Sequence, residues 1–218
     1  MNGHEMSLLM YADDIVFVSK SYTGLQKMLD CLHKWCMQWK LKVNIDKTKV
    51  IHFRQGPKSS KTNFVFKYGS EVLEIVSSYT YLGLLFNEFL DDSLSCKAIA
   101  RSASRALGLL IAKSKAHGGM PYETFTKLYN SLVQPVMDYS AGIWGTKMFS
   151  CINSVQRRAE RFFLGVGKYT PNAALQGELG WNTPEHHYWL CVFHLWLRLK
   201  TMDKTRINYR VFAWSSGP

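Results

Sequence analysis

Hydrophobic and polar positions follow two different patterns along this chain, and the change comes near residue 92. Before it, short apolar runs alternate with polar links, which is typical of β-strands. One segment there differs, because its apolar residues recur at three- and four-residue spacing and so predict an amphipathic helix. Its apolar positions are Leu25, Met28, Leu29, Leu32, Trp35, Cys36 and Trp39. Helical spacing then continues after residue 92. The pattern therefore predicts an α+β chain, with strands and one helix in residues 1–91 and only helices in residues 92–218.

The first pair of expected strands encloses two adjacent aspartates. Apolar runs at residues 8–11 and 15–18 lie on either side of Ala12-Asp13-Asp14, and two such runs joined by a short link predict a β-hairpin. The link lacks the Asn-Gly or Asp-Gly pair that favours tight hairpin turns. The aspartates therefore need an explanation other than turn chemistry.

Weaker signals mark the remaining boundaries. Thr23 and Gln26 have the spacing of a capping box, which predicts that the first helix begins at Thr23. Thr170-Pro171 and Thr183-Pro184 each resemble an N-cap followed by a first-turn proline. Further strands are expected at residues 50–53, 64–66, 72–76 and 79–86, a polar loop at 55–62, and helices at 93–116, 121–134 and 149–164.

Composition limits the class of protein. The chain has 218 residues, of which 47% are hydrophobic, so a sizeable core is expected. Its apolar runs are too short for a membrane span, which needs roughly 18 apolar residues, and residues 1–5 lack the order of a signal peptide. Five scattered cysteines without a CxxC pair indicate reduced thiols. We therefore expect an intracellular protein of the nucleus or cytoplasm that is not secreted and does not bind membranes.

The formal net charge of +11 is concentrated in the second half of the chain. Residues 1–100 have a net charge of +2, and residues 101–218 have a net charge of +9. A basic half favours an anionic partner, and nucleic acid is the first candidate. A generically basic surface is the alternative.

Two groups of basic residues have helical spacing. Lys97, Arg101 and Arg105 recur every four residues, so on a helix they would form a stripe about 12 Å long at a rise of about 1.5 Å per residue. Phosphates along one nucleic-acid strand are roughly 7 Å apart, so such a stripe could follow a backbone. Arg157 and Arg161 predict a second, shorter stripe. The alternative for both groups is a solvated helix face.

His187, Cys191 and His194 share one face of an expected helix. A zinc site would need a fourth ligand in tetrahedral geometry, and none is evident nearby in the sequence. Large apolar residues surround the three, so a buried helix is the favoured interpretation over a metal site.

Asp13 and Asp14 fit a particular chemistry. Phosphoryl transfer to a nucleic-acid end uses two divalent metals roughly 3.5–4 Å apart, which clamp the attacking and leaving oxygens. Mg²⁺ prefers carboxylate oxygens. Adjacent aspartates at a hairpin tip would supply part of such a site, whereas an ordinary acidic turn is the alternative.

Residues 9–17 resemble the active-site hairpin of reverse transcriptases, and the similarity is to those of non-LTR retrotransposons of the long-interspersed-element type. The resemblance continues through several ordered motifs downstream. These are Asn44 with Lys47-Thr48-Lys49, Tyr81-Leu82-Gly83, Leu128-Tyr129 through Pro135 with Tyr139 and Trp144-Gly145, Gln156-Arg157-Arg158-Ala159, and Glu178-Leu179-Gly180.

The resemblance implies RNA-templated DNA synthesis with Mg²⁺, deoxynucleotide triphosphates, an RNA template and a DNA primer. Residues 1–91 would be the C-terminal part of a polymerase palm, with antiparallel strands and one helix, and residues 92–218 an all-helical thumb with its extension. Asp13 and Asp14 would bind metal, and Lys47 would face the triphosphate or protonate pyrophosphate. Tyr11 would pack near the primer end. The alternatives are a plain strand aromatic for Tyr11 and a solvated loop lysine for Lys47.

One departure from the family lies at the front of the chain. The family has a third catalytic aspartate and a fingers region upstream of the hairpin, and here the hairpin comes almost at once. We therefore expect a reverse transcriptase fragment that is inactive alone and exposes the sheet surface its missing half would cover. The alternative is a non-catalytic nucleic-acid-binding remnant.

Overall fold

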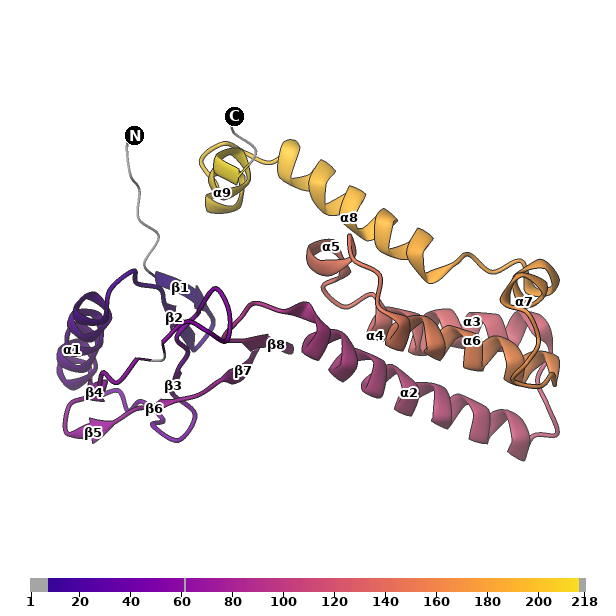
Figure 1. Cartoon of the computed structure of the whole chain (residues 1–218), viewed down its shortest axis with the longest axis horizontal. Coiled ribbons are helices and arrows are strands. Elements are labelled where there is room, and N and C mark those ends of the chain that lie inside the picture. The colour runs from indigo at the N-terminus through magenta and orange to yellow at the C-terminus, as the bar shows by residue number, and fades with distance from the viewer. Residues whose placement is uncertain (1–7, 61, 216–218) are drawn as a thin grey trace. The chain divides into compact units, whose positions relative to one another are not determined.

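A computed structural model describes residues 8–60 and 62–215 of the chain (Figure 1). The chain divides into two compact units, residues 1–91 and residues 92–218. Strands lie only in the first unit among these described residues, and helices make up the second. The mixed α+β composition agrees with the expectation from the sequence, whereas the identities of palm and thumb stay predictions.

Unit 1 contains one helix and eight short strands in its described part. The helix is α1 (Tyr22–Gln38). The strands are β1 (Leu8–Tyr11), β2 (Asp14–Phe17), β3 (Lys49–Val50), β4 (Lys67–Tyr68), β5 (Glu71–Val72), β6 (Glu74–Ile75), β7 (Ser78–Tyr81) and β8 (Leu84–Asn87).

The strands form four two-stranded pairs, β1–β2, β3–β6, β4–β5 and β7–β8. Three pairs are antiparallel, but β3 and β6 run parallel, with Lys49 opposite Glu74 and Val50 opposite Ile75. The expectation of antiparallel strands alone is therefore wrong for this pair. Parallel pairing needs a long crossover, and here the chain between β3 and β6 supplies it through the β4–β5 hairpin.

The core of unit 1 lies where α1 meets the strands. Its buried members are Leu29, Val50, Phe66 and Leu73, each less than 10% exposed. A polar side chain also links α1 to strand β4 by hydrogen bonds. The amide of Gln26 donates to the carbonyl of Lys67 at 2.8 Å and accepts from the Lys67 N–H at 2.9 Å. The Gln26 amide thus satisfies the backbone N–H and carbonyl of Lys67, which a neighbouring strand would otherwise pair.

Several expected strands are shorter than the apolar runs that predicted them. Only Val50 of residues 50–53 lies in a strand, residues 64–66 lie in none, and a break at Leu73 separates β5 from β6. The expected strand at 79–86 is a hairpin, because Leu82 and Gly83 both have positive φ, at 47° and 78°. Two positive φ values are the signature of a type I′ turn.

Helix α1 begins at Tyr22, one residue before the predicted Thr23. Its N-cap is Ser21, whose hydroxyl accepts from the N–H of Gly24 at 3.1 Å. Thr23 lies inside the helix, and Gln26 binds Lys67 and Asp30 rather than closing a capping box. The capping-box prediction is therefore wrong, because a tertiary contact uses the side chain of Gln26.

Unit 2 is a set of helices around an aromatic and aliphatic core. They are α2 (Asp92–Ala116), α3 (Tyr122–Leu132), α4 (Gln134–Met137), α5 (Ala141–Trp144), α6 (Ser150–Leu164), α7 (Asn172–Leu179), α8 (Pro184–Lys200) and α9 (Ile207–Ser215). Helix α2 packs on α6, and α5 packs on α8. Ala103, Leu107, Phe125, Tyr129 and Trp144 are at most 1% exposed and form the centre of this core.

Helix boundaries in unit 2 show how prolines act. The expected helix at 121–134 ends at Leu132, and Pro135 lies in the first turn of the separate helix α4. A proline in a first turn costs no hydrogen bond, so it starts a helix rather than ending one. Thr183 caps α8 as predicted, since its hydroxyl accepts from the N–H of His186 at 3.2 Å. Helix α7 instead has Pro171 at its N-cap position, so the prediction for Thr170 is wrong.

Candidate catalytic hairpin and nucleic-acid interface

The two aspartates lie at the tip of the β1–β2 hairpin. Tyr11 pairs with Asp14, so Ala12 and Asp13 form a two-residue loop. Ala12 has a φ of 52° and Asp13 does not have a positive φ, which is the pattern of a type II′ turn. A left-handed alanine costs roughly 1–2 kcal/mol. The hairpin therefore stores strain at the residue that aims the two carboxylates.

The hairpin presents a different chemistry on each face. Neighbouring strand residues point to opposite faces, so the pairing puts Asp14 with Tyr11 on one face of the hairpin. The other face is apolar. With α1 it forms a groove of about 450 Å³ lined by Leu8, Met10, Ile15, Phe17, Lys27, Met28, Cys31, Leu32 and Trp35.

Asp13 and Asp14 are exposed, and neither makes an ion pair or a side-chain hydrogen bond within the described residues. Mg²⁺ is commonly held by one or two carboxylates together with waters and substrate phosphates. An exposed, unpaired pair of carboxylates fits that donor set. Over residues 8–60 and 62–215 no group of three His, Cys, Asp or Glu side chains could hold a metal by itself.

Lys47 lies in a hydrogen-bonded turn just before β3. The Asn44 side chain accepts from the N–H of Lys47 at 3.2 Å, and the Lys47 carbonyl accepts from the Tyr79 hydroxyl at 2.9 Å. The side chain of Lys47 is exposed. Asn44 therefore organises the turn, and the backbone of Lys47 is fixed while its ammonium group can meet an anion.

The first basic stripe lies on the outer face of α2. Lys97, Arg101 and Arg105 are all exposed, whereas Ala103 and Leu107 on the opposite face are fully buried. The Arg105 guanidinium also donates to the Ser102 hydroxyl at 2.9 Å. The helix thus brings the three cations together along one solvent-facing edge.

The second predicted stripe is directed inward. Arg157 donates to the carboxylate of Glu160 at 3.0 Å, and that carboxylate is fully buried. Arg161 donates to the Thr170 carbonyl at 3.2 Å and to the Asn172 side chain at 2.9 Å. Both guanidinium groups therefore hold the α6–α7 region together, and the geometry does not favour them as contacts for nucleic acid.

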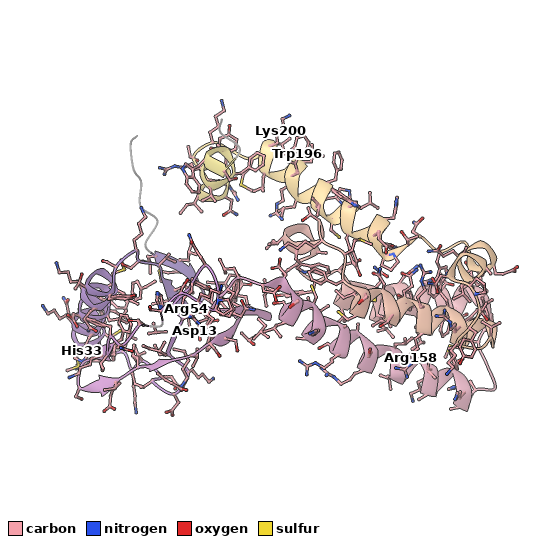
Figure 2. The ribbon with its side chains drawn as sticks, viewed as in Figure 1. Asp13, His33, Arg54, Arg158, Trp196 and Lys200 are labelled. Atoms are coloured by element: carbon pink, nitrogen blue, oxygen red, sulfur yellow. The ribbon has the colours of Figure 1, made fainter. Side chains whose placement is uncertain are left out.

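Arg158 is the exposed arginine of α6 (Figure 2). The four-residue spacing of Arg157 and Arg161 predicted the stripe, although Arg158 also lies three residues before Arg161 in that helix. Val155 and Ala159 are apolar and buried, so they define the inner face of α6. Their spacing in the sequence could have placed Arg158 on the outer face.

The three residues His187, Cys191 and His194 do not gather into a metal site. Within the described part of the chain, these side chains belong to no cluster of three or more His, Cys, Asp or Glu residues that could hold a metal ion. His187 and Cys191 are half-buried against α5, whereas His194 is exposed. The expected buried helix is buried on one face alone, and its other face exposes Trp189 and Phe193.

No helix among the described residues combines the length and the hydropathy that a transmembrane segment requires.

Comparisons with known proteins find a matching family and several relatives of this chain. The family described as reverse transcriptase (RNA-dependent DNA polymerase) matches residues 1–86. Over 187 residues the chain is 28% identical to a probable RNA-directed DNA polymerase from transposon BS of Drosophila melanogaster, a match that covers 82% of this chain and 20% of that protein. No solved structure matches the chain.

Two further relatives also come from mobile elements. A putative uncharacterized transposon-derived protein of Caenorhabditis elegans is 27% identical over 66% of this chain and 50% of its own length. The RNA-directed DNA polymerase from mobile element jockey of Drosophila melanogaster is 22% identical over 72% of this chain and 17% of its own length. The chain thus spans half or less of each of these relatives.

Proposed function

We propose that this chain is the C-terminal palm and thumb segment of an RNA-directed DNA polymerase of a non-LTR retrotransposon, because its residues 1–86 match the reverse transcriptase family and it is similar to proteins of mobile elements. Unit 1 would be the part of the palm that carries Asp13 and Asp14. Unit 2 would be the thumb and its extension. The observation that supports this best is the exposed, unpaired pair of aspartates at the tip of a β-hairpin.

In this proposal each side chain has a defined task. Asp13 and Asp14 hold Mg²⁺, which when bound activates the primer 3′-hydroxyl and stabilises the charge on the phosphoryl group. Tyr11, on the same hairpin face as Asp14, packs against the primer end or the nucleotide sugar. Lys47 offers its exposed ammonium group to the triphosphate.

The stripe on α2 supplies the grip on template and product. Three exposed cations along one helix edge can neutralise phosphates without reading bases. Arg158 adds an exposed cation on α6, the helix that packs against α2. We assign backbone contact to these residues in preference to Arg157 and Arg161, whose guanidinium groups are used within unit 2.

Catalysis is expected to require a further carboxylate. The hairpin supplies two, and the described residues offer no third ligand near them. In a primer-extension assay with an RNA template, a DNA primer and Mg²⁺, we expect no extension by residues 1–218 alone. Extension that is lost in Asp13→Asn but kept in the exposed control Asp46→Asn would contradict this, because the chain would then be a complete catalyst.

Backbone binding by α2 has a quantitative test. Binding of a labelled RNA–DNA hybrid, measured by fluorescence anisotropy over a salt series, gives the slope of log K against log[salt]. Replacing Lys97, Arg101 and Arg105 by glutamine should make that slope about 2.7 less steep, at roughly 0.9 per phosphate contact. The control variant Lys58→Gln, Lys127→Gln, Lys168→Gln removes the same charge elsewhere. An equal change in both variants would show a generically basic surface.

The second candidate function is a non-catalytic nucleic-acid-binding remnant. The net charge of +9 in residues 101–218 favours it.

The two candidate functions differ in whether Asp13 and Asp14 bind a metal ion. Fe²⁺ can replace Mg²⁺ and, with ascorbate and peroxide, cleaves the backbone beside its site. Cleavage near residues 11–15 that disappears in Asp13→Asn, Asp14→Asn supports a polymerase metal site. Uniform or absent cleavage supports the remnant.

A further inference from the structure

Helix α8 carries an aromatic strip on the face that points away from the rest of unit 2. Trp189, Phe193 and Trp196 are 56%, 54% and 41% exposed. The opposite face is packed, since Tyr188 is fully buried and Leu195 lies against Gly142 of α5. Isolated exposed apolar residues are common, but three large aromatic rings on one helix face need an explanation.

The rings follow one another closely along the helix. Steps of four and three residues correspond to rises of roughly 6 Å and 4.5 Å. The rings of Phe193 and Trp196 stack, with centroids 5.9 Å apart and an interplanar angle of 25°. The ammonium group of Lys200 lies 4.6 Å from the centroid of the Trp196 ring. Figure 2 labels both residues near the end of α8. The strip therefore ends at a cation.

The charge around this strip is positive. Residues 184–215 contain five arginines and lysines and two acidic residues, Glu185 and Asp203. Both acidic side chains have partners within unit 2. Asn153 donates to the Glu185 carboxylate at 2.6 Å, and the carboxylate of Asp203 accepts from the Thr205 hydroxyl and N–H at 2.7 Å each. The exposed cations are Arg198, Lys200, Lys204, Arg206 and Arg210.

We propose that this face of α8 is a stacking platform for single-stranded nucleic acid. Unpaired bases would stack on Trp189, Phe193 and Trp196, while Lys200 and the cations of the α8–α9 segment contact phosphates. Aromatic rings beside positive charge are how proteins hold single strands without sequence preference. The bases of a duplex hide their faces, so the strip selects a single strand.

This site extends the proposed function but uses neither the aspartates nor the α2 stripe. In a polymerase it would hold template or product strand that is not paired. Its ligand class is single-stranded RNA or DNA, whereas the α2 stripe is assigned to duplex backbone. The two surfaces can therefore fail independently of each other.

The decisive variant removes the rings but keeps the apolar bulk. Binding of residues 1–218 to a labelled oligouridine of about 20 nucleotides is measured by fluorescence anisotropy at low salt. Trp189→Leu, Phe193→Leu, Trp196→Leu should weaken it at least about ten-fold, since stacking contributes roughly 1–3 kcal/mol per base. Binding of a duplex of the same length should change less than about two-fold. Circular dichroism confirms that the variant keeps its helices.

A neighbouring pair provides the control. Leu190 and Leu197 are exposed on the same side of α8, and Leu190→Ala, Leu197→Ala leaves the rings in place, so oligouridine binding should stay within about two-fold. Several outcomes would overturn the proposal. The first is an affinity for oligouridine that does not change in the leucine variant, and the second is an equal loss of affinity for the duplex. The third is a protein that does not bind oligouridine but self-associates or binds vesicles, with that binding abolished by the alanine pair.

Discussion

At the scale of single residues, neighbouring arginines in one helix have opposite roles. Arg157 and Arg158 are adjacent in helix α6, yet Arg157 donates to the buried Glu160 and Arg158 is exposed. Gln156 also donates to Glu160, at 2.9 Å. The carboxylate is therefore tied by two side chains of its own helix, and it is buried only because they are there.

This difference predicts opposite effects on stability. Arg157→Ala leaves the fully buried Glu160 carboxylate without its cation, so it should lower the free energy of unfolding by about 3 kcal/mol. Arg158→Ala, at an exposed position, should change it by less than about 0.5 kcal/mol. Urea unfolding followed by circular dichroism at pH 7 measures both. Equal losses would mean that Glu160 does not depend on Arg157.

At the scale of elements, helix ends are set by short backbone motifs. Helix α6 ends in a Schellman motif, in which Val166 N–H donates to the Arg161 carbonyl at 3.1 Å and Gly165 N–H to the Phe162 carbonyl at 3.2 Å. Gly165 has a φ of 65° there, which a residue with a Cβ adopts only under strain. This end turns the chain back toward α7, where Arg161 joins the two helices.

The end of α6 therefore supplies a matched pair of glycine substitutions. Gly165→Ala should destabilise the protein by about 1 kcal/mol, because the left-handed conformation is costly with a Cβ. Gly167→Ala should be neutral or stabilising by up to about 1 kcal/mol, since an added Cβ meets no atom within 4 Å there and its φ is not positive. Thermal melting separates the two. A loss of stability in Gly167→Ala as large as in Gly165→Ala would contradict the assignment.

At the scale of the whole molecule, the two units expose apolar surface in different ways. Unit 2 buries large aromatic residues such as Trp144 and Tyr188 in its interior. Unit 1 leaves an apolar groove open between α1 and the hairpin, where Met10 is 63% exposed. Its strands also occur only in pairs within the described residues, so each pair has open edges. Such surfaces favour association with other chains.

We therefore expect unit 1 to drive self-association of the isolated chain. Met10→Lys puts a charge in the apolar groove and should lower the fraction of oligomer several-fold in sedimentation velocity. Met148→Lys is the control, because Met148 is 56% exposed but lies in unit 2. Monomeric protein before any substitution, or an equal effect of both variants, would show that the groove does not cause association.

Local signals allowed much of this fold to be predicted. Apolar spacing indicated the hairpin around Asp13 and Asp14, helix α1 and the long helix α2, because period-two and period-3.6 patterns depend on neighbours in the chain. The cap at Thr183 was predicted for the same reason. The roles of Asp13, Asp14 and Lys47 stay predictions, since the site also depends on chemistry that the fold alone does not test.

The sequence by itself determined helix α1, the long helix α2 and the hairpin that carries two aspartates at its tip, since those features arise from neighbouring residues. Only the tertiary structure decided the parallel pairing of β3 with β6, the bond from Gln26 to Lys67 and the exposure of one face of α8. It also decided that Arg157 points inward and Arg158 outward. The reason is that burial and pairing depend on residues far away in the chain, which no local pattern reveals.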